Sequence, residues 1–151
     1  MCIRDREISQ ILNNDNKDEK ISLLSSLIDI RDSMIIREII SALDDNEIRV
    51  RGEAFSSLFL NDNDISEVLI SSLTDGSKNI RAFSALILAN RGNSNSINSL
   101  IDLTKDASGM VRSCAFGALG HLEQNKPKKK FMMEFLMIIL RLKKALHLHC
   151  I

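Results

Sequence analysis

Residues 106–119 read Asp106-Ala107-Ser108-Gly109-Met110-Val111-Arg112-Ser113-Cys114-Ala115-Phe116-Gly117-Ala118-Leu119, and the same pattern of residue types occurs twice earlier in the chain. The earlier copies are residues 45–58 and 75–88. In each copy an Asp is followed five positions later by Val or Ile, then by Arg, and further on by a small residue and a Leu. A repeat of about 30 residues is typical of solenoids built from stacked helix pairs. The pattern therefore predicts one structural unit that is used several times.

The residues before each copy have the spacing of a helix that is apolar on one face. Ile36, Ile39, Ile40 and Leu43 stand at i, i+3, i+4 and i+7, and residues 66–73 and 97–104 repeat this spacing in part. Polar residues at 61–64 and 91–96 then separate one copy from the next. Each unit is thus predicted to be a first helix, a tight turn, a second helix and a polar turn. No segment alternates apolar and polar residues for long enough to predict a strand.

The repeated Asp, Val/Ile-Arg, small-residue and Leu positions resemble those of HEAT-like repeats, as found in bilin lyase subunits and in bacterial HEAT repeat proteins with armadillo-like folds. The resemblance covers residues 33–122 clearly and residues 7–30 as a degenerate first unit. It implies an all-α fold, a right-handed α-solenoid of about three clear helix pairs, and a role in protein binding or scaffolding. We expect a repeat domain over residues 7–125 and a basic and apolar segment over residues 126–151.

Within the degenerate first unit, the apolar spacing predicts a short helix over residues 7–12 and a second helix over residues 19–30. The next helix follows directly, and either Asp32 or Ser33 can act as its N-cap.

The repeated Asp and Arg residues are predicted to hold the stack together rather than to bind a ligand. The Asp precedes the second helix of a unit, where its carboxylate can accept backbone N–H groups. The Arg comes six residues later and can reach the Asp of an adjacent unit. We expect a structural ladder formed by Asp45, Arg51, Asp75, Arg81, Asp106 and Arg112.

The candidate binding surface is the concave face of the solenoid, which the second helices line. On that face we expect Glu53, Asn90 and His121 as polar contacts and Phe83 as an exposed apolar anchor for a partner. Alternatively, Phe83 and Cys114 are partly buried packing residues.

No catalytic residue, cofactor or metal site is predicted. His121 has no Cys, Ser or carboxylate at a spacing that indicates a catalytic pair. His147, His149 and Cys150 are close in sequence, but side chains two positions apart on a helix point to different faces, and no second ligand group accompanies them.

Charge is unevenly distributed, although the formal net charge is zero. Residues 126–151 hold seven of the 20 Lys and Arg residues and one of the 20 Asp and Glu residues, so this segment is basic and the rest of the chain is acidic. An acidic body argues against nucleic acid as a partner, because nucleic-acid binding neutralises phosphates. The three Cys residues are far apart and the first residues lack the apolar core of a signal peptide, so we expect a cytoplasmic protein.

The segment after Pro127 has several interpretations. Residues 131–140 are apolar nearly all round a helix, but they span only about half the length that a membrane crossing needs. The segment can be a terminal helix that covers the last unit, a truncated fourth unit or an out-of-frame tail. A basic helix at a membrane surface fits its length and composition less well.

The sequence thus predicts a non-catalytic module for protein–protein interaction or scaffolding, with a protein as its partner, in a fragment of a longer protein. One alternative, which the resemblance suggests, is a bilin lyase-like subunit. A second alternative is a DNA glycosylase of HEAT-like repeats, although the chain has no Trp or Tyr for stacking on bases.

Overall fold

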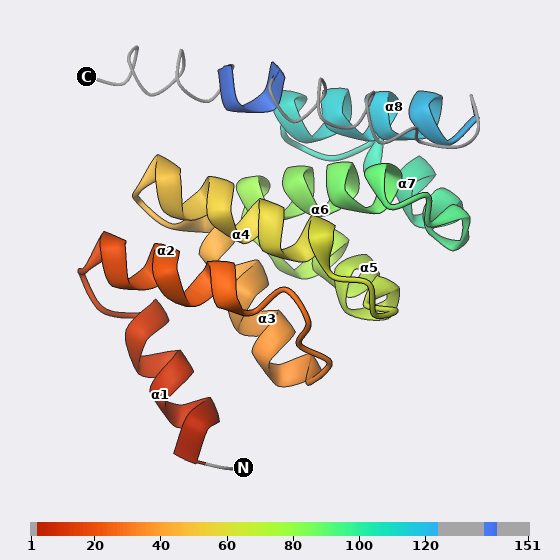
Figure 1. The fold of residues 1–151 in the computed structure, drawn as a ribbon. Coiled ribbons are helices and arrows are strands. Elements are labelled where there is room, and N and C mark those ends of the chain that lie inside the picture. The colour runs from red at the N-terminus through yellow and green to blue at the C-terminus, as the bar shows by residue number, and fades with distance from the viewer. Residues whose placement is uncertain (1–2, 124–137, 142–151) are drawn as a thin grey trace.

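The computed structural model describes residues 3–123 and 138–141, and its helices pair along the chain into four units (Figure 1). Unit 1 contains α1 (Ile3–Leu12) and α2 (Lys17–Ser26), and unit 2 contains α3 (Ser33–Ser41) and α4 (Ile48–Leu60). Unit 3 contains α5 (Ser66–Asp75) and α6 (Lys78–Asn90), and unit 4 contains α7 (Ile97–Leu103) and α8 (Gly109–Glu123). Short 3₁₀ turns at Ala42–Asp44 and Ser94–Ser96 adjoin α3 and α7.

The units stack so that equivalent helices lie side by side. The first helices, α1, α3, α5 and α7, form one layer, and the second helices, α2, α4, α6 and α8, form the other layer, which we call the B layer. No strand occurs in the described ranges, and the fold is an all-α solenoid as predicted. Unit 1 is a complete helix pair that begins at Ile3, before the predicted start at residue 7. The right-handed sense of the solenoid stays a prediction.

Polar side chains define where several helices begin and end. Asp32 is the N-cap of α3, since its carboxylate accepts a hydrogen bond from the Met34 backbone N–H at 2.9 Å. Helix α2 ends at Ser26, four residues before the predicted end. The Ser25 and Ser26 hydroxyls donate to carbonyls three residues back, at 2.9 and 2.7 Å, a local bonding pattern that competes with continuation of a helix.

The core lies between the two layers and runs without interruption through all four units. The small residues that recur in the second helices, Ala54, Ser84 and Ala115, are completely buried. Small side chains at these places let neighbouring helices approach closely. Helix α6 is enclosed most fully, because every residue from 82 to 90 is buried.

Only residues 138–141 are described in the basic and apolar segment, as a single helical turn. Ile139 is 7% exposed and belongs to the continuous core, whereas Ile138 is 51% exposed. The other predictions for residues 126–151, including those for His147, His149 and Cys150, lie outside the described residues.

Candidate functional site

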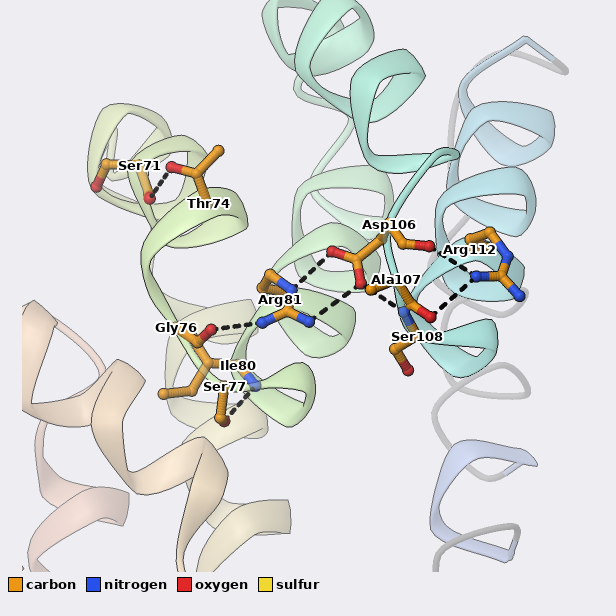
Figure 2. Close-up of polar contacts among 10 residues, drawn as sticks. All are labelled: Ser71, Thr74, Gly76, Ser77, Ile80, Arg81, Asp106, Ala107, Ser108 and Arg112. Atoms are coloured by element: carbon orange, nitrogen blue, oxygen red, sulfur yellow. Dashed lines mark hydrogen bonds and ion pairs between the residues drawn. The ribbon is translucent and has the colours of Figure 1, made fainter.

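Units 3 and 4 are joined by an ion pair between Arg81 and Asp106 (Figure 2). Arg81 Nε donates to Asp106 Oδ2 at 2.8 Å, and Nη2 donates to Oδ1 at 3.0 Å. Arg81 Nη1 also donates to the Gly76 carbonyl at 2.7 Å, so the guanidinium is held from both sides. The hydrogen bonds from Arg81, and then the one from the Ser108 backbone N–H, lower the pKa of Asp106.

Units 1 and 2 are joined by an equivalent pair in which a lysine replaces the arginine. Lys20 Nζ lies 2.8 Å from Asp45 Oδ2, and both side chains are 11% exposed. The Asp45 carboxylate also accepts the Glu47 backbone N–H at 2.9 Å, as Asp106 accepts that of Ser108. Lys20 was not predicted as part of the ladder, because the cation is an arginine in the three repeated copies. The signal was present, since each acid lies 25 residues after its cation.

The predicted ladder is wrong at three positions, Arg51, Arg112 and Asp75. Arg51 donates to the Asp45 carbonyl and Arg112 to the carbonyls of Asp106 and Ala107, and neither is in an ion pair within the described residues. Asp75 is exposed and has no ion pair in the same part of the chain.

Asp75 is left out of the ladder because the turn between the two helices of unit 3 is shifted by one residue. Helix α5 extends to Asp75, and Gly76 supplies the carbonyl to which Arg81 donates. Ser77 is then the N-cap of α6, a position that an Asp was predicted to serve. Units 2 and 3 are linked instead by a neutral donor, since Asn79 Nδ2 lies 2.9 Å from Asp44 Oδ1.

A second set of polar links lies at the opposite ends of the B-layer helices and was not predicted. Asn61 is 2% exposed, and its Nδ2 donates to the Ile30 carbonyl at 2.8 Å, which ties unit 2 to unit 1. Arg91 of unit 3 donates to the carbonyls of Leu58, Asn61 and Asn63. Burial lowers the pKa of the Arg91 guanidinium. Backbone carbonyls are acceptors at any residue type, so no pattern of side chains predicts these links.

Two of the four predicted contact residues are buried. Phe83 is 7% exposed and packs edge-on against Phe55, with ring centroids 6.4 Å apart. Asn90 is 2% exposed. Phe83 is therefore not an exposed anchor but a buried packing residue, because α6 is enclosed along residues 82–90. A contact of Phe83 or Asn90 with a partner stays a prediction. Glu53 and His121 are partly exposed, and their contact role stays a prediction.

The described residues hold no group of three His, Cys, Asp or Glu side chains that could bind a metal ion. Partial burial lowers the pKa of His121, and burial raises the pKa of the Cys114 thiol, which favours the protonated and less nucleophilic form. A cavity of about 310 Å³ beside Arg81 and Asp106 is lined by their paired charges, which already satisfy each other. Within residues 3–123 and 138–141, no helix has the length and apolar character needed to span a membrane.

The end of unit 4 that no helix pair covers among the described residues, which we call the free end, exposes apolar side chains that are more buried at the equivalent positions of other units. Phe116 of α8 is 62% exposed, whereas Phe55 and Ala85 at the same repeat position are 2% and 0% exposed. Ile101 of α7 is 47% exposed, whereas its equivalents Ile40 and Ile70 are 4% exposed and partly buried. Arg112, the equivalent of Arg81, is exposed at this end as well.

The family model of HEAT repeats matches residues 66–136, which include units 3 and 4. No curated protein matches the chain. HEAT repeats generally mediate protein interaction or scaffolding, and the family is generally non-enzymatic. The match is to HEAT repeats in general, so the particular likeness to bilin lyase subunits stays a prediction. The paired helices, their repeated Asp and Arg positions and this match together support the prediction of a HEAT-like repeat protein.

Proposed function

We propose that the chain is a non-catalytic module that binds a helical partner protein at the free end of unit 4. The observation that carries this proposal is the exposure of Phe116, at 62%, where the equivalent Phe55 is 2% exposed. In units 1 to 3 the helix pair of the next unit covers the residue that is equivalent to Phe116. A helix pair of a partner would bury Phe116 and Ile101 in the same way, and large buried aromatic side chains often dominate binding energy.

The electrostatics of this end agree with a helical partner. Arg112 donates to the carbonyls of Asp106 and Ala107, as Arg81 does to that of Gly76. Arg81 in addition binds the carboxylate that begins the next unit. A partner that offers a carboxylate in a helix-preceding turn would complete the same arrangement at Arg112.

The test is affinity capture from the source cell with the full chain as bait. Phe116→Ser and Ile101→Ser should each lose a specific partner that the unchanged chain retains. Met34→Ser is the matched control, because Met34 is also highly exposed, at 58%, but belongs to unit 2. Retention of every specific partner by the Phe116→Ser variant would contradict the proposal.

We also place the module in the cytoplasm. Cys114 is a free thiol, which supports a reducing compartment. The bilin lyase-like and DNA glycosylase alternatives have no specific observation in their favour.

A further inference from the structure

Residues 138–141 return to the B layer and pack against α4, which lies two units earlier in the stack. Leu140 Cδ2 lies 3.3 Å from the place that a Cβ on Gly52 would occupy. Ile139 is 7% exposed and belongs to the same core as α4 and α6. Figure 1 shows this turn in blue, on the side of the stack where the B-layer helices lie.

Gly52 makes this approach possible. It lies within α4, where a glycine costs about 1 kcal/mol of helix stability relative to alanine. Its lack of a Cβ leaves room for Leu140, since a Cβ at this place would require Leu140 to shift by a few tenths of an ångström and a larger side chain would require more. Two other helical glycines, Gly117 and Gly120, have nothing within 4 Å of such a Cβ.

Helix α6, which neighbours α4 in the B layer, is enclosed as well. A second helix of a solenoid normally leaves its concave side open to solvent or to a partner. In α6, however, Phe83 is 7% exposed and Ile87 is completely buried. A helix that is enclosed all round needs an apolar cover on each side. The buried Ile139 is an apolar contribution to the cover of this layer.

We propose that the B-layer face around Gly52 is a docking surface for a short apolar helix with basic flanks, and that residues 138–141 occupy it in cis. A partner helix of the same chemistry competes with this segment for the face. Residues 126–151 carry a net charge of +6 and residues 1–125 carry −6, so the two parts of the chain attract each other overall. This inference deepens the proposed protein-binding function, but it concerns a different surface from the one around Phe116.

The first experiment measures binding of a fluorescein-labelled peptide of residues 128–146 to the full chain by fluorescence anisotropy. Ile139→Asp should release the segment and increase the apparent affinity for the peptide by roughly 10-fold or more. The reason is that only molecules whose face is open can bind the peptide, and the apparent affinity falls in proportion to their fraction. Ile138→Asp is the matched control, because Ile138 is 51% exposed, and it should bind the peptide as the unchanged chain does. Equal peptide binding by the Ile139→Asp and Ile138→Asp variants would overturn the proposal.

The second experiment does not require a change in the segment itself. Gly52→Leu should accelerate hydrogen exchange of the backbone amides at 138–141 by roughly 10-fold or more, because it lowers the docked fraction. Gly117→Leu introduces the same side chain where the structure has open space and should leave that exchange unchanged. Unchanged exchange in Gly52→Leu would overturn the proposal.

The same samples also distinguish other possible occupants of the B-layer face around Gly52. A dimer that dissociates in the Ile139→Asp variant, seen by sedimentation, would show docking between two copies and contradict docking in cis. Binding of the released segment to phosphatidylserine vesicles, with no peptide binding to the B layer, would replace the helix-docking proposal with membrane attachment. Capture of a partner through Phe116 is independent of these results, so either proposal can fail alone.

Discussion

Arg81 of α6 and Asp106 in the turn before α8 meet across the boundary between units 3 and 4 in a two-point ion pair, with distances of 2.8 and 3.0 Å (Figure 2). The two side chains are 22% and 12% exposed, so solvent screens them only in part. Since Arg81 also bonds Gly76 in its own unit, one side chain fastens two consecutive turns of the solenoid.

Arg81→Ala should lower the free energy of unfolding by about 1–2 kcal/mol, since it removes hydrogen bonds that involve two charged groups. Chemical denaturation followed by circular dichroism measures this change. Arg112→Ala is the control, because Arg112 makes the bonds to its own turn but has no ion pair among the described residues. Equal losses in the two variants would show that the ion pair adds nothing to the stability of the stack.

Asp106→Asn should reveal a stabilisation that is lost in acid. The pKa of Asp106 is lowered in the folded state, chiefly by the hydrogen bonds from Arg81. The stabilisation is therefore fully present above the pKa of an unfolded Asp, about 3.9, and is lost as the pH falls through the lower folded value. The difference in unfolding free energy between the unchanged chain and Asp106→Asn should be constant near neutral pH and shrink below about pH 4.

The double variant is the control for this pH dependence. In an Arg81→Ala background, Asp106→Asn should show a smaller dependence of stability on pH, because the main cause of the lowered pKa is gone. The same acid-dependent difference in both backgrounds would assign the lowered pKa to the Ser108 backbone N–H instead.

Ser84→Ala should raise the unfolding free energy by about 1 kcal/mol. Ser84 is completely buried, and its hydroxyl has no hydrogen-bond partner among the described residues. The equivalent residues Ala54 and Ala115 show that alanine fits this position in the other units. Thermal and chemical denaturation measure the gain, and Ser84→Val should instead lose stability by overpacking. A loss in Ser84→Ala would mean that the hydroxyl is bonded in solution.

Asn61→Ala should cost about 1–2 kcal/mol, because it removes two hydrogen bonds of a buried amide, one to the Ile30 carbonyl and one from the Asn63 backbone N–H. Asn13→Ala is the control, since the Asn13 side chain is exposed and bonds Ser9 within its own helix region. That variant should change stability by less than about 0.5 kcal/mol. A similar small effect in Asn61→Ala would show that water replaces the amide.

The sequence predicted the fold well because a repeated pattern reports the same packing several times. The fully buried Ala54 and Ala115 lie where that pattern places small residues. The role of Asp75 was not predictable by analogy, since Gly76 lets α5 run to Asp75 and shifts the register of the following turn.

The candidate site was predicted less well, for a different physical reason. Whether Phe83 is exposed depends on what covers α6, and no local spacing carries that information. The contact between Leu140 and Gly52 joins residues far apart in the chain, and it falls outside the repeat period. Lys20, by contrast, could have been found by extending the 25-residue separation of cation and acid to lysine.

The boundary between units 2 and 3 is fastened unequally at its two ends. At one end Arg91 donates to the carbonyl of Leu58 in α4 and to those of Asn61 and Asn63 in the connection between the units. At the other end Asp75 has no ion pair within the described residues, and the neutral bond from Asn79 to Asp44 stands in its place. The polar links at this boundary are therefore strong at the end that holds Arg91 and weak at the end that holds Asn79. Under tension we expect this boundary to separate first at the Asn79 end, because a hydrogen bond from a neutral amide is weaker than the ion pairs at the two neighbouring boundaries.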